Sequence, residues 1–381
     1  MSQTIDYAKR LIAAPSVTPA TGAVFDAMEG MLSPLGFDVH RFTRGDGDVG
    51  TDEAPVENLF AIRHGPEDSR HFAFAGHLDV VPPGDGWDSD PFEPTEKGEL
   101  LYGRGAVDMK SAIAAMVAAI SDIPVDAGTI SFIITGDEEG PALHGTRALI
   151  DYMTEQGVTP DLCLVGEPTS VDRLGDMMKI GRRGSVNIWL TVEGTQGHVA
   201  YPHMADNPIP KLVAMLAELD ALMLDTGTEW FQASNLEITE IEVGNRAHNV
   251  IPATAKARIS IRFNDLHTGA SLSERVVAIA ENHGGSALPI VSGEPFLTQP
   301  GAFSNAVAAA IESETGVTPE QSTSGGTSDA RFLRSVCPVI EFGLCNATMH
   351  KRDEAVALAD LDVLARIYAR IVHAALSGIE Q

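Results

Sequence analysis

"TISFIITGDEEG", residues 129–140, is the stretch that decides the fold class. Residues 129–135 are an apolar, β-branched run with the length of a buried strand. Three consecutive acids, Asp137, Glu138 and Glu139, follow this run at once. Adjacent carboxylates repel one another and contribute nothing to a core. These acids therefore form either a solvated turn or a site that holds a cation.

Similar apolar runs occur elsewhere in the chain. The other strands that we predict here are 71–76 (HFAFAG), 161–166 (DLCLVG) and 337–343 (CPVIEFG). The predicted helices are residues 4–13, 22–35, 110–121, 144–157, 301–315 and 359–377. Alternation of strands and helices favours an α/β domain with parallel strands.

The pattern changes after Gly184. In "SVNIWLTVEG", period-2 alternation places Val186, Ile188, Leu190 and Val192 on one face. The elements predicted after it are a helix at 208–224, strands at 235–243 and 255–263, a helix at 270–283 and a short strand at 288–293. The order β-α-β-β-α-β is that of a ferredoxin-like layer.

We therefore predict one α/β catalytic domain with a mostly parallel mixed sheet flanked by helices, interrupted by an inserted α+β ferredoxin-like domain. The predicted boundaries are 1–181 and 295–381 for the two parts of the first domain and 182–294 for the inserted one. A length of 381 residues suits two domains.

Composition limits the partners. The formal net charge of −27 argues against nucleic-acid binding, which needs clustered Lys and Arg, although a few arginines could still bind an anionic substrate. The longest apolar run, residues 112–120, is far too short to span a membrane. The three cysteines are widely spaced and form no CxxC pair, as expected in a reducing cytoplasm. We predict a cytoplasmic protein.

Histidines and acids follow the predicted strands. In open α/β sheets the ligand crevice lies at the carboxyl ends of the strands, so these residues should meet at one edge. Asp108 joins them from "YGRGAVDMK", a glycine-rich loop just before a helix. The candidate set is His77, Asp79, Asp108, Glu138, Glu139, Glu167 and His350.

Imidazole and carboxylate donors without thiolates suit zinc, cobalt or manganese. The set is larger than one catalytic metal needs. Two metals sharing a bridging carboxylate would use two histidines and three acids, which leaves two acids for other duties. Any one of these residues alone is more often a cap, a turn or a surface residue, so their joint placement carries the prediction.

Several motifs, in order and spacing, resemble the di-zinc amidohydrolase and aminopeptidase superfamily over essentially the whole chain. They are GHLDVVPPGDGW, YGRGAVDMK, TGDEEGPALHGT, VGEPTS, GRRGS, GTQGHVAYPHMADNP, NVIP, SGGTSDARF and FGLCNATMHKRDE. Of these, GRRGS, QGHVAYPH and SGGTSDARF point more narrowly to an enzyme that removes a succinyl group from a diamino acid. The resemblance implies hydrolysis of a linear amide in an anionic small-molecule substrate.

The resemblance also implies the metal ligands. His77, Asp108 and Glu167 would hold one Zn²⁺, and Asp108, Glu139 and His350 the other, with Asp108 bridging. Co²⁺ could substitute for zinc.

Further roles are implied in the same way. Asp79 would orient the imidazole of His77, and Glu138 would be the general base for the attacking water. The inserted domain would form a homodimer and supply His198 across the interface as a donor to the oxyanion. Without the resemblance, His198 would be interpreted as a turn histidine.

The resemblance finally implies a set of substrate-binding residues for carboxylates and an amine: Arg183, Asn249, Arg262, Gly326 and Thr327. Bidentate arginines are a direct way for an acidic protein to hold a polyanion. On pattern alone, Arg262 is equally an ordinary charge on an edge strand.

Other classes are weaker. A serine hydrolase needs a G-x-S-x-G elbow, which the chain lacks, and "GRGAVD" stops short of a dinucleotide-binding G-x-G-x-x-G. A non-catalytic ligand-binding protein should have lost the base, yet Glu138 is present. Within the superfamily, an acetylornithine deacetylase, an aminoacylase or a dipeptidase would share every metal residue.

Overall fold

The computed structural model describes residues 2–48 and 50–378. Their contacts form two compact units. The first unit comprises the chain up to Ile180, Thr298–Ser322 and the chain from Ser328 on. The second unit comprises Gly181–Leu297 and the short segment Thr323–Thr327.

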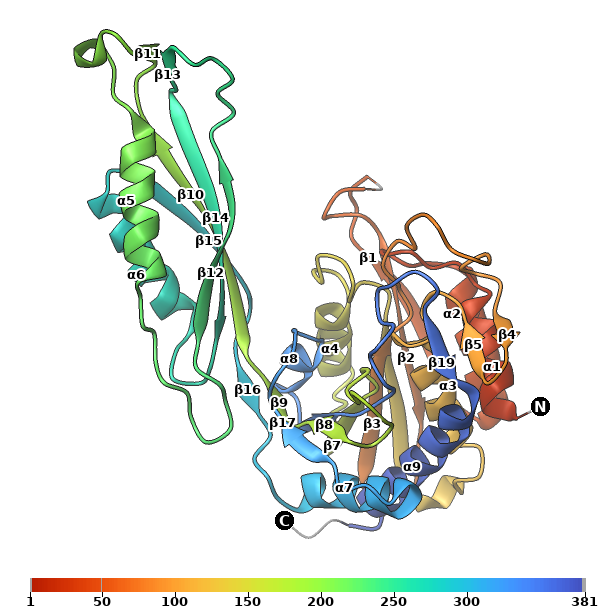
Figure 1. The fold of residues 1–381 in the computed structure, drawn as a ribbon. Coiled ribbons are helices and arrows are strands. Elements are labelled where there is room, and N and C mark those ends of the chain that lie inside the picture. Colours follow the sequence, from red (N-terminus) through yellow and green to blue (C-terminus); the bar gives the residue numbers. More distant parts are fainter. Residues whose placement is uncertain (1, 49, 379–381) are drawn as a thin grey trace. The chain divides into compact units, whose positions relative to one another are not determined.

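The first unit is built on an eight-stranded mixed sheet (Figure 1). Its order is β1 (Asp38–Arg44), β2 (Val56–Arg63), β6 (Thr129–Thr135), β3 (His71–His77), β7 (Leu162–Val165), β18 (Val339–Glu341), β8 (Met177–Lys179) and β17 (Glu320–Ser322). Strands β6, β3, β7 and β18 are neighbours and run parallel. These are the four strands that the apolar runs predict, so the fold class is confirmed.

Antiparallel strands extend the sheet on both sides of this parallel centre. Strands β1 and β2 pair antiparallel with each other, and β2 pairs antiparallel with β6. On the other side β8 pairs antiparallel with β18 and parallel with β17. The sequence prediction does not include strands β1, β2, β8 and β17. Strand β1 is mostly exposed, and β8 and β17 have only three residues each, whereas β2 is a buried apolar strand whose signal was missed.

Helices flank the sheet. They are α1 (Gln3–Ile12), α2 (Ala23–Leu32), α3 (Lys110–Ala119), α4 (Thr146–Glu155), α7 (Ala302–Thr315), α8 (Ala330–Leu333) and α9 (Leu358–Leu376). Helix α3 is alanine-rich and almost entirely buried, and it packs between α1 and α9. A side chain on Gly76, in β3, would collide with Met109 at the start of α3. Gly76 therefore leaves room against β3 for the end of the Met109 side chain.

The second unit contains a four-stranded antiparallel sheet, ordered β12 (Asn235–Glu242), β14 (Thr254–Phe263), β10 (Gly184–Glu193) and β15 (Ser286–Gly293). Helices α5 (Pro208–Asp220) and α6 (Gly269–Asn282) lie on one side of it (Figure 1). Val186, Ile188, Leu190 and Val192 are fully buried in this core, as the alternation predicts. The chain order and strand order are those of a ferredoxin-like layer.

Helix α5 ends at Asp220, four residues earlier than predicted. Leu222 and Leu224 still pack against the core, but from non-helical chain. Their apolar pattern was therefore a signal of burial and not of further helix.

Short paired strands complete the fold. They are β4 (Thr95–Lys97), β5 (Leu100–Tyr102) and β19 (Ala355–Ala357) in one sheet, β9 (Gly181–Arg182) with β16 (Phe296–Leu297), and β11 (Gly197–His198) with β13 (Val250–Ile251). Within residues 2–48 and 50–378, no helix is long and apolar enough to cross a membrane.

Candidate metal centre

The candidate ligands of the first unit meet at the carboxyl ends of its parallel strands. His77 is the last residue of β3, and Glu138 and Glu139 follow β6. Glu167 follows β7. His350 lies in the loop between β18 and β19, where its φ of 60° is left-handed.

Asp108 lies between two histidines. Its Oδ1 is 3.1 Å from Nε2 of His77, and its Oδ2 is 3.1 Å from Nε2 of His350. Nε2 of His350 is also 2.7 Å from Oε1 of Glu139, and Nε2 of His77 is 3.9 Å from Oε1 of Glu167. The two carboxylate oxygens of Asp108 thus face two different groups of donors.

Among the residues that the structure describes, three overlapping groups of side chains offer ligand atoms within 4.8 Å of one another. Two of them, His77–Asp108–Glu167 and Asp108–Glu139–His350, share Asp108 and have the composition of the two predicted triads. The third is His77–Glu138–Glu139. All donors are nitrogen and oxygen, which suits a divalent metal such as zinc, cobalt or manganese. The residues present therefore fit a metal.

Asp79 contacts both His77 and the acidic loop that follows β6. Nδ1 of His77 donates to the backbone carbonyl of Asp79 at 2.9 Å, which leaves Nε2 for a metal. The Asp79 carboxylate lies further away, 3.6 Å from Nδ1. It accepts instead from the backbone N–H groups of Glu138 (3.1 Å) and Glu139 (2.9 Å). Its main contact is therefore with the acidic loop and not with the imidazole.

Asp137, the remaining acid of "ITGDEEG", has no place in the three groups. It is buried, and its Oδ2 accepts from the backbone N–H groups of Leu143 (3.0 Å) and His144 (3.4 Å). Asp137 closes the loop that follows β6.

The charges of this centre shift the pKa values of its histidines. Burial would lower the pKa of His77, but the hydrogen bond and charge of Asp108 outweigh it and raise that pKa well above its usual value. Hydrogen bonds with Asp108 and Glu139 raise the pKa of His350 to about 10. Burial opposes the effect of the two histidines on Asp108, whose pKa is nevertheless lowered.

The pKa values of two acids of this centre are raised. Burial and then the negative charge of Glu167 raise the pKa of Glu138 well above its usual value. Burial raises the pKa of Asp79 to about 6, against the effect of His77. Carboxylates that repel each other in this way would be relieved by a cation between them.

Sequence reasoning missed Glu354, a fully buried acid whose carboxylate accepts hydrogen bonds from the loop that carries Asp108. It also missed Asp329, a buried acid whose Oδ2 accepts from the hydroxyl of Thr146 at 2.6 Å. Both lie inside motifs already quoted, "MHKRDE" and "SGGTSDARF". Their placement beside other loops, which only the fold provides, was the missing signal.

The other predicted residues lie in the second unit. His198 is exposed in β11, where it pairs with Val250, and its Nδ1 accepts from the N–H of Ala200 at 3.1 Å. The carbonyl of Asn249 accepts from the N–H of Val199 at 3.1 Å. The structure thus brings His198 and Asn249 together.

Arg183 and Arg262 also form a pair. Arg183 donates to Oδ1 of Asn235 at 3.0 Å, and Arg262 donates to the hydroxyl of Ser185. Burial and then the like charge of Arg183 lower the pKa of Arg262. Among the residues that the structure describes, neither guanidinium has a carboxylate partner.

Gly326 and Thr327 lie in the glycine-rich segment Thr323–Thr327. The carbonyl of Gly326 accepts from Nη1 of Arg182 at 3.1 Å. Gly326 is exposed and Thr327 half-buried.

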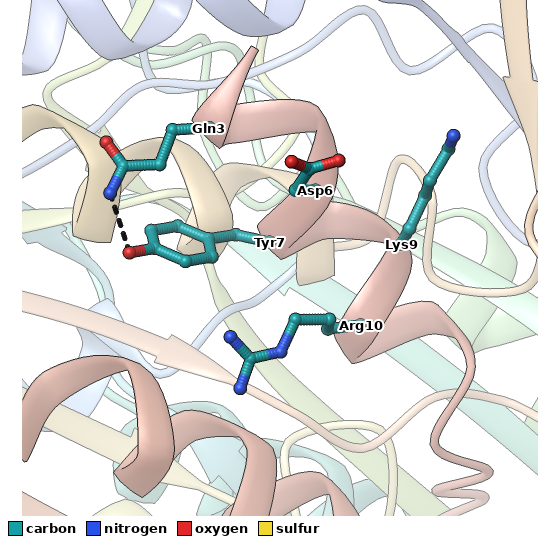
Figure 2. A pocket seen from close by; sticks show the side chains of 5 residues that line it. All are labelled: Gln3, Asp6, Tyr7, Lys9 and Arg10. Atoms are coloured by element: carbon teal, nitrogen blue, oxygen red, sulfur yellow. Dashed lines mark hydrogen bonds between the residues drawn. The ribbon is translucent and has the colours of Figure 1, made fainter. Parts of the chain in front are cut away.

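Figure 2 shows a hollow that lies apart from this chemistry and is lined by Gln3, Asp6, Tyr7, Lys9 and Arg10 of helix α1. Gln3 donates to the hydroxyl of Tyr7 at 2.7 Å across it. One acid and two cations on a single helix are an ordinary solvated surface, and we assign no function to it.

A mixed α/β sheet with imidazole and carboxylate donors at its strand ends defines a metal-dependent amide hydrolase, which is the predicted enzyme class. The model described as "Peptidase family M20/M25/M40" matches residues 73–374, and the chain belongs to this family.

Close relatives are similar over nearly their whole length. A succinyl-diaminopimelate desuccinylase of Erythrobacter litoralis is 79% identical over 99% of this chain and 100% of its own. One of Novosphingobium aromaticivorans is 70% identical over 97% of this chain and 98% of its own. An M20 family metallo-carboxypeptidase of Sulfolobus solfataricus is 15% identical, with a TM-score of 0.77 over 99% and 100% of the two chains, and shares the fold.

Proposed function

We propose that the chain hydrolyses N-succinyl-LL-2,6-diaminopimelate to succinate and LL-2,6-diaminopimelate, the desuccinylase step of lysine biosynthesis through diaminopimelate. The observation that carries this proposal is full-length identity of 79% and 70% to proteins named for that activity. The shared Asp108 between two donor triads supports the hydrolytic part of it.

The metal assignment is part of the proposal. His77, Asp108 and Glu167 would hold one Zn²⁺, and Asp108, Glu139 and His350 would hold a second, with Co²⁺ as a substitute. When bound, the two ions would polarise the amide carbonyl and lower the pKa of the attacking water. The donor atoms within 4.8 Å of one another support this division of the ligands.

Glu138 is the general base in this proposal. Its carboxylate takes a proton from the water that attacks the amide carbon, and returns that proton to the leaving amine nitrogen. The backbone N–H groups of Glu138 and Glu139 both donate to the carboxylate of Asp79. Asp79 therefore fixes the position of the base relative to the neighbouring metal ligand. Burial and then the charge of Glu167 raise the pKa of Glu138, which makes its carboxylate a better proton acceptor than an exposed one.

The substrate-binding residues would be Arg183, Asn249, Arg262, Gly326 and Thr327. Two arginines without carboxylate partners among the described residues are an unusual feature in a chain of net charge −27. Like charges this close are costly unless an anion joins them, which supports binding of substrate carboxylates here.

The role of Arg262 in substrate binding can be tested against a control arginine on the same strand. Arg262→Lys should raise KM for the succinylated substrate about tenfold or more, because a lysine loses the bidentate fork, and should leave metal content unchanged. Arg258→Lys is the matched control, because Arg258 lies on the same strand β14 but pairs with Glu240. Equal KM values for both variants would remove Arg262 from the substrate site.

The assembly would be a cytoplasmic homodimer formed through the inserted domain, residues 182–294. Two apolar side chains close to His198 in the sequence, those of Tyr201 and Met204, are exposed. Subunit interfaces cover exposed apolar side chains of this kind. In this proposal His198 donates to the oxyanion in the partner's site.

Subunit mixing tests this role. Glu138→Gln and His198→Ala subunits are each inactive as pure dimers if His198 acts across the interface. A mixed dimer has one site with both groups intact, so refolding the two together should restore activity. Activity that stays lost in mixed dimers, or a monomer in sedimentation, would contradict the proposal.

The substrate itself is tested by bound metal and turnover. The purified protein should contain divalent metal and hydrolyse the succinylated diaminopimelate far faster than N-acetylornithine or simple dipeptides. A preference for either of the latter would show an acetylornithine deacetylase, aminoacylase or dipeptidase, and would leave the metal assignment standing. Metal binding with no turnover of any amide would indicate a ligand-binding protein.

A further inference from the structure

Glu354 follows His350 by four residues and has no role in the proposed chemistry. It is fully buried. Its Oε1 accepts from the backbone N–H groups of Val107 at 2.7 Å and Asp108 at 3.1 Å. Its Oε2 accepts from the N–H of Gly105 at 3.1 Å. Three N–H groups of one loop therefore converge on a single carboxylate, as in an anion-binding nest.

Arg104, on the same loop, compensates the charge of this carboxylate. Its Nη1 donates to Oε2 of Glu354 at 2.6 Å, and both side chains are buried. Its Nη2 donates to the carbonyl of Pro83 at 3.3 Å, and the guanidinium lies 5.1 Å from the centre of the Trp87 ring. The pair adds no net charge to the metal cluster. A buried ion pair is weak evidence for stability. We therefore explain the Arg104–Glu354 pair by its effect on the position of the loop that carries Asp108.

The path of the loop depends on this acceptor. Gly105 has a φ of +84°, and a Cβ on it would lie 2.8 Å from Val80 and 2.9 Å from Lys110. The loop is therefore tightly wound against its neighbours. Without Glu354, three buried N–H groups would lose their partner, which is costly.

Glu354 also joins two distant parts of the chain. Its own carbonyl accepts from the N–H of Gly103 at 3.0 Å, and Ala355 pairs with Tyr102 between β19 and β5. The segment that carries His350 is thereby held against the loop that carries Asp108. These two ligands are 3.1 Å apart, Nε2 to Oδ2.

We infer that Glu354 is a positioning residue of the metal centre: by holding loop 105–108 beside the His350 segment, it sets the separation between Asp108 and His350. The inference rests on the ligands assigned in the proposed function. Changing Glu354 should weaken metal binding by the triad that contains both residues, Asp108–Glu139–His350.

The test is a zinc titration of metal-free protein in competition with a chromophoric chelator. The wild type should bind two equivalents, and in Glu354→Gln at least one should bind about 10–100-fold more weakly. The control is Glu314→Gln, because Glu314 also binds arginines, Arg366 and Arg370, but touches no ligand loop. It should bind zinc as the wild type does.

Wild-type affinities in Glu354→Gln would overturn the inference while leaving the proposed function intact. A wild type that binds no zinc would instead refute the metal part of the proposed function.

Two further measurements cover a variant that does not fold because Arg104 is left buried without its anion. The double variant Arg104→Gln/Glu354→Gln carries no unpaired charge and should show the same 10–100-fold weakening. In the metal-free wild type, the amides of Gly105, Val107 and Asp108 should exchange their hydrogens slowly, because Glu354 holds them before any metal arrives. Rapid exchange of this segment would overturn the inference.

Discussion

The two ends of strand β3 carry the same residue type in different surroundings. His71 opens the strand, with its Nε2 2.9 Å from the hydroxyl of Ser131, and burial lowers its pKa to about 4. His77 ends the strand, and although burial alone would also lower its pKa, Asp108 raises it well above the usual value. The comparison shows that burial favours the neutral form of a histidine, whereas acids from neighbouring loops favour its charged form.

The acids gather at only one of these ends because of the topology. Strands β6, β3 and β7 are parallel, so the loops that leave them all emerge beside His77. Changes at the His77 end should therefore affect activity and metal binding, whereas a change at the His71 end should affect only stability.

The largest effect is expected at the carboxyl end, from Glu138→Gln. This variant keeps the shape of the side chain but cannot accept a proton, so kcat should fall about 10²–10⁴-fold. Zinc content should stay at the wild-type level, measured by elemental analysis. Activity within threefold of the wild type would remove Glu138 as the base.

The next effect is expected from Asp79→Asn. Its carboxylate accepts from the N–H groups of both Glu138 and Glu139, and an amide can offer only one oxygen to them. Activity and zinc affinity should each fall about 10–100-fold, measured by turnover and by chelator competition. A loss of thermal stability with unchanged zinc affinity would show that Asp79 supports only the fold.

A smaller effect concerns pH and zinc binding to the metal-free protein. The pKa of His350 is raised to about 10 and that of His77 is raised well above its usual value, and both shifts favour the protonated imidazole in the metal-free protein. Zinc must displace those protons, so its affinity should rise with pH by roughly tenfold per unit for each proton released. Titrations between pH 6 and 8 measure this slope, and His71→Gln should not change it. A flat profile would contradict the assignment.

The smallest effect is expected at the other end of the strand. The pKa of His71 is about 4 in the folded protein and about 6.5 when unfolded, so the unfolded chain binds the extra proton. The stability from neutral His71 is therefore fully present above pH 6.5 and is lost as pH falls toward 4.

Relative to His71→Gln, the metal-free wild type should lose roughly 2–3 kcal/mol by pH 4.5, a few degrees in Tm. Thermal melts of both proteins at pH 8 and 4.5 measure the difference. Parallel changes in the two proteins would show that His71 titrates normally.

Much of this site could be predicted because its ligands stand next to strong strand signals. The runs before His77, Glu139 and Glu167 are apolar and short, and parallel pairing then brings their ends together. Position within "DEEG" could not predict which acid is the metal ligand and which is the general base, because adjacent residues differ only in which side of the chain they face. That division came from a family resemblance.

The contacts that could not be predicted are long-range hydrogen bonds to backbone. Nothing in the residues around Glu354 indicates that its carboxylate meets the N–H of Asp108, 246 positions away in the chain. Likewise, nothing in the residues around Asp79 indicates that its carboxylate accepts from the N–H groups of Glu138 and Glu139. Such partners are set by tertiary packing, and local pattern does not contain them.

The first unit is made of chain segments that lie before and after the second unit. Its candidate metal ligands are therefore synthesised at different times. On the ribosome the chain emerges from its N-terminus, so His77, Asp108, Glu139 and Glu167 precede the entire second unit, whereas His350 and Glu354 follow it. Of the two proposed ligand triads, a nascent chain that ends within the Gly181–Leu297 segment can contain only His77–Asp108–Glu167. The other proposed triad, Asp108–Glu139–His350, becomes complete only after the inserted Gly181–Leu297 segment has been made, so filling of both proposed sites would follow synthesis of that segment.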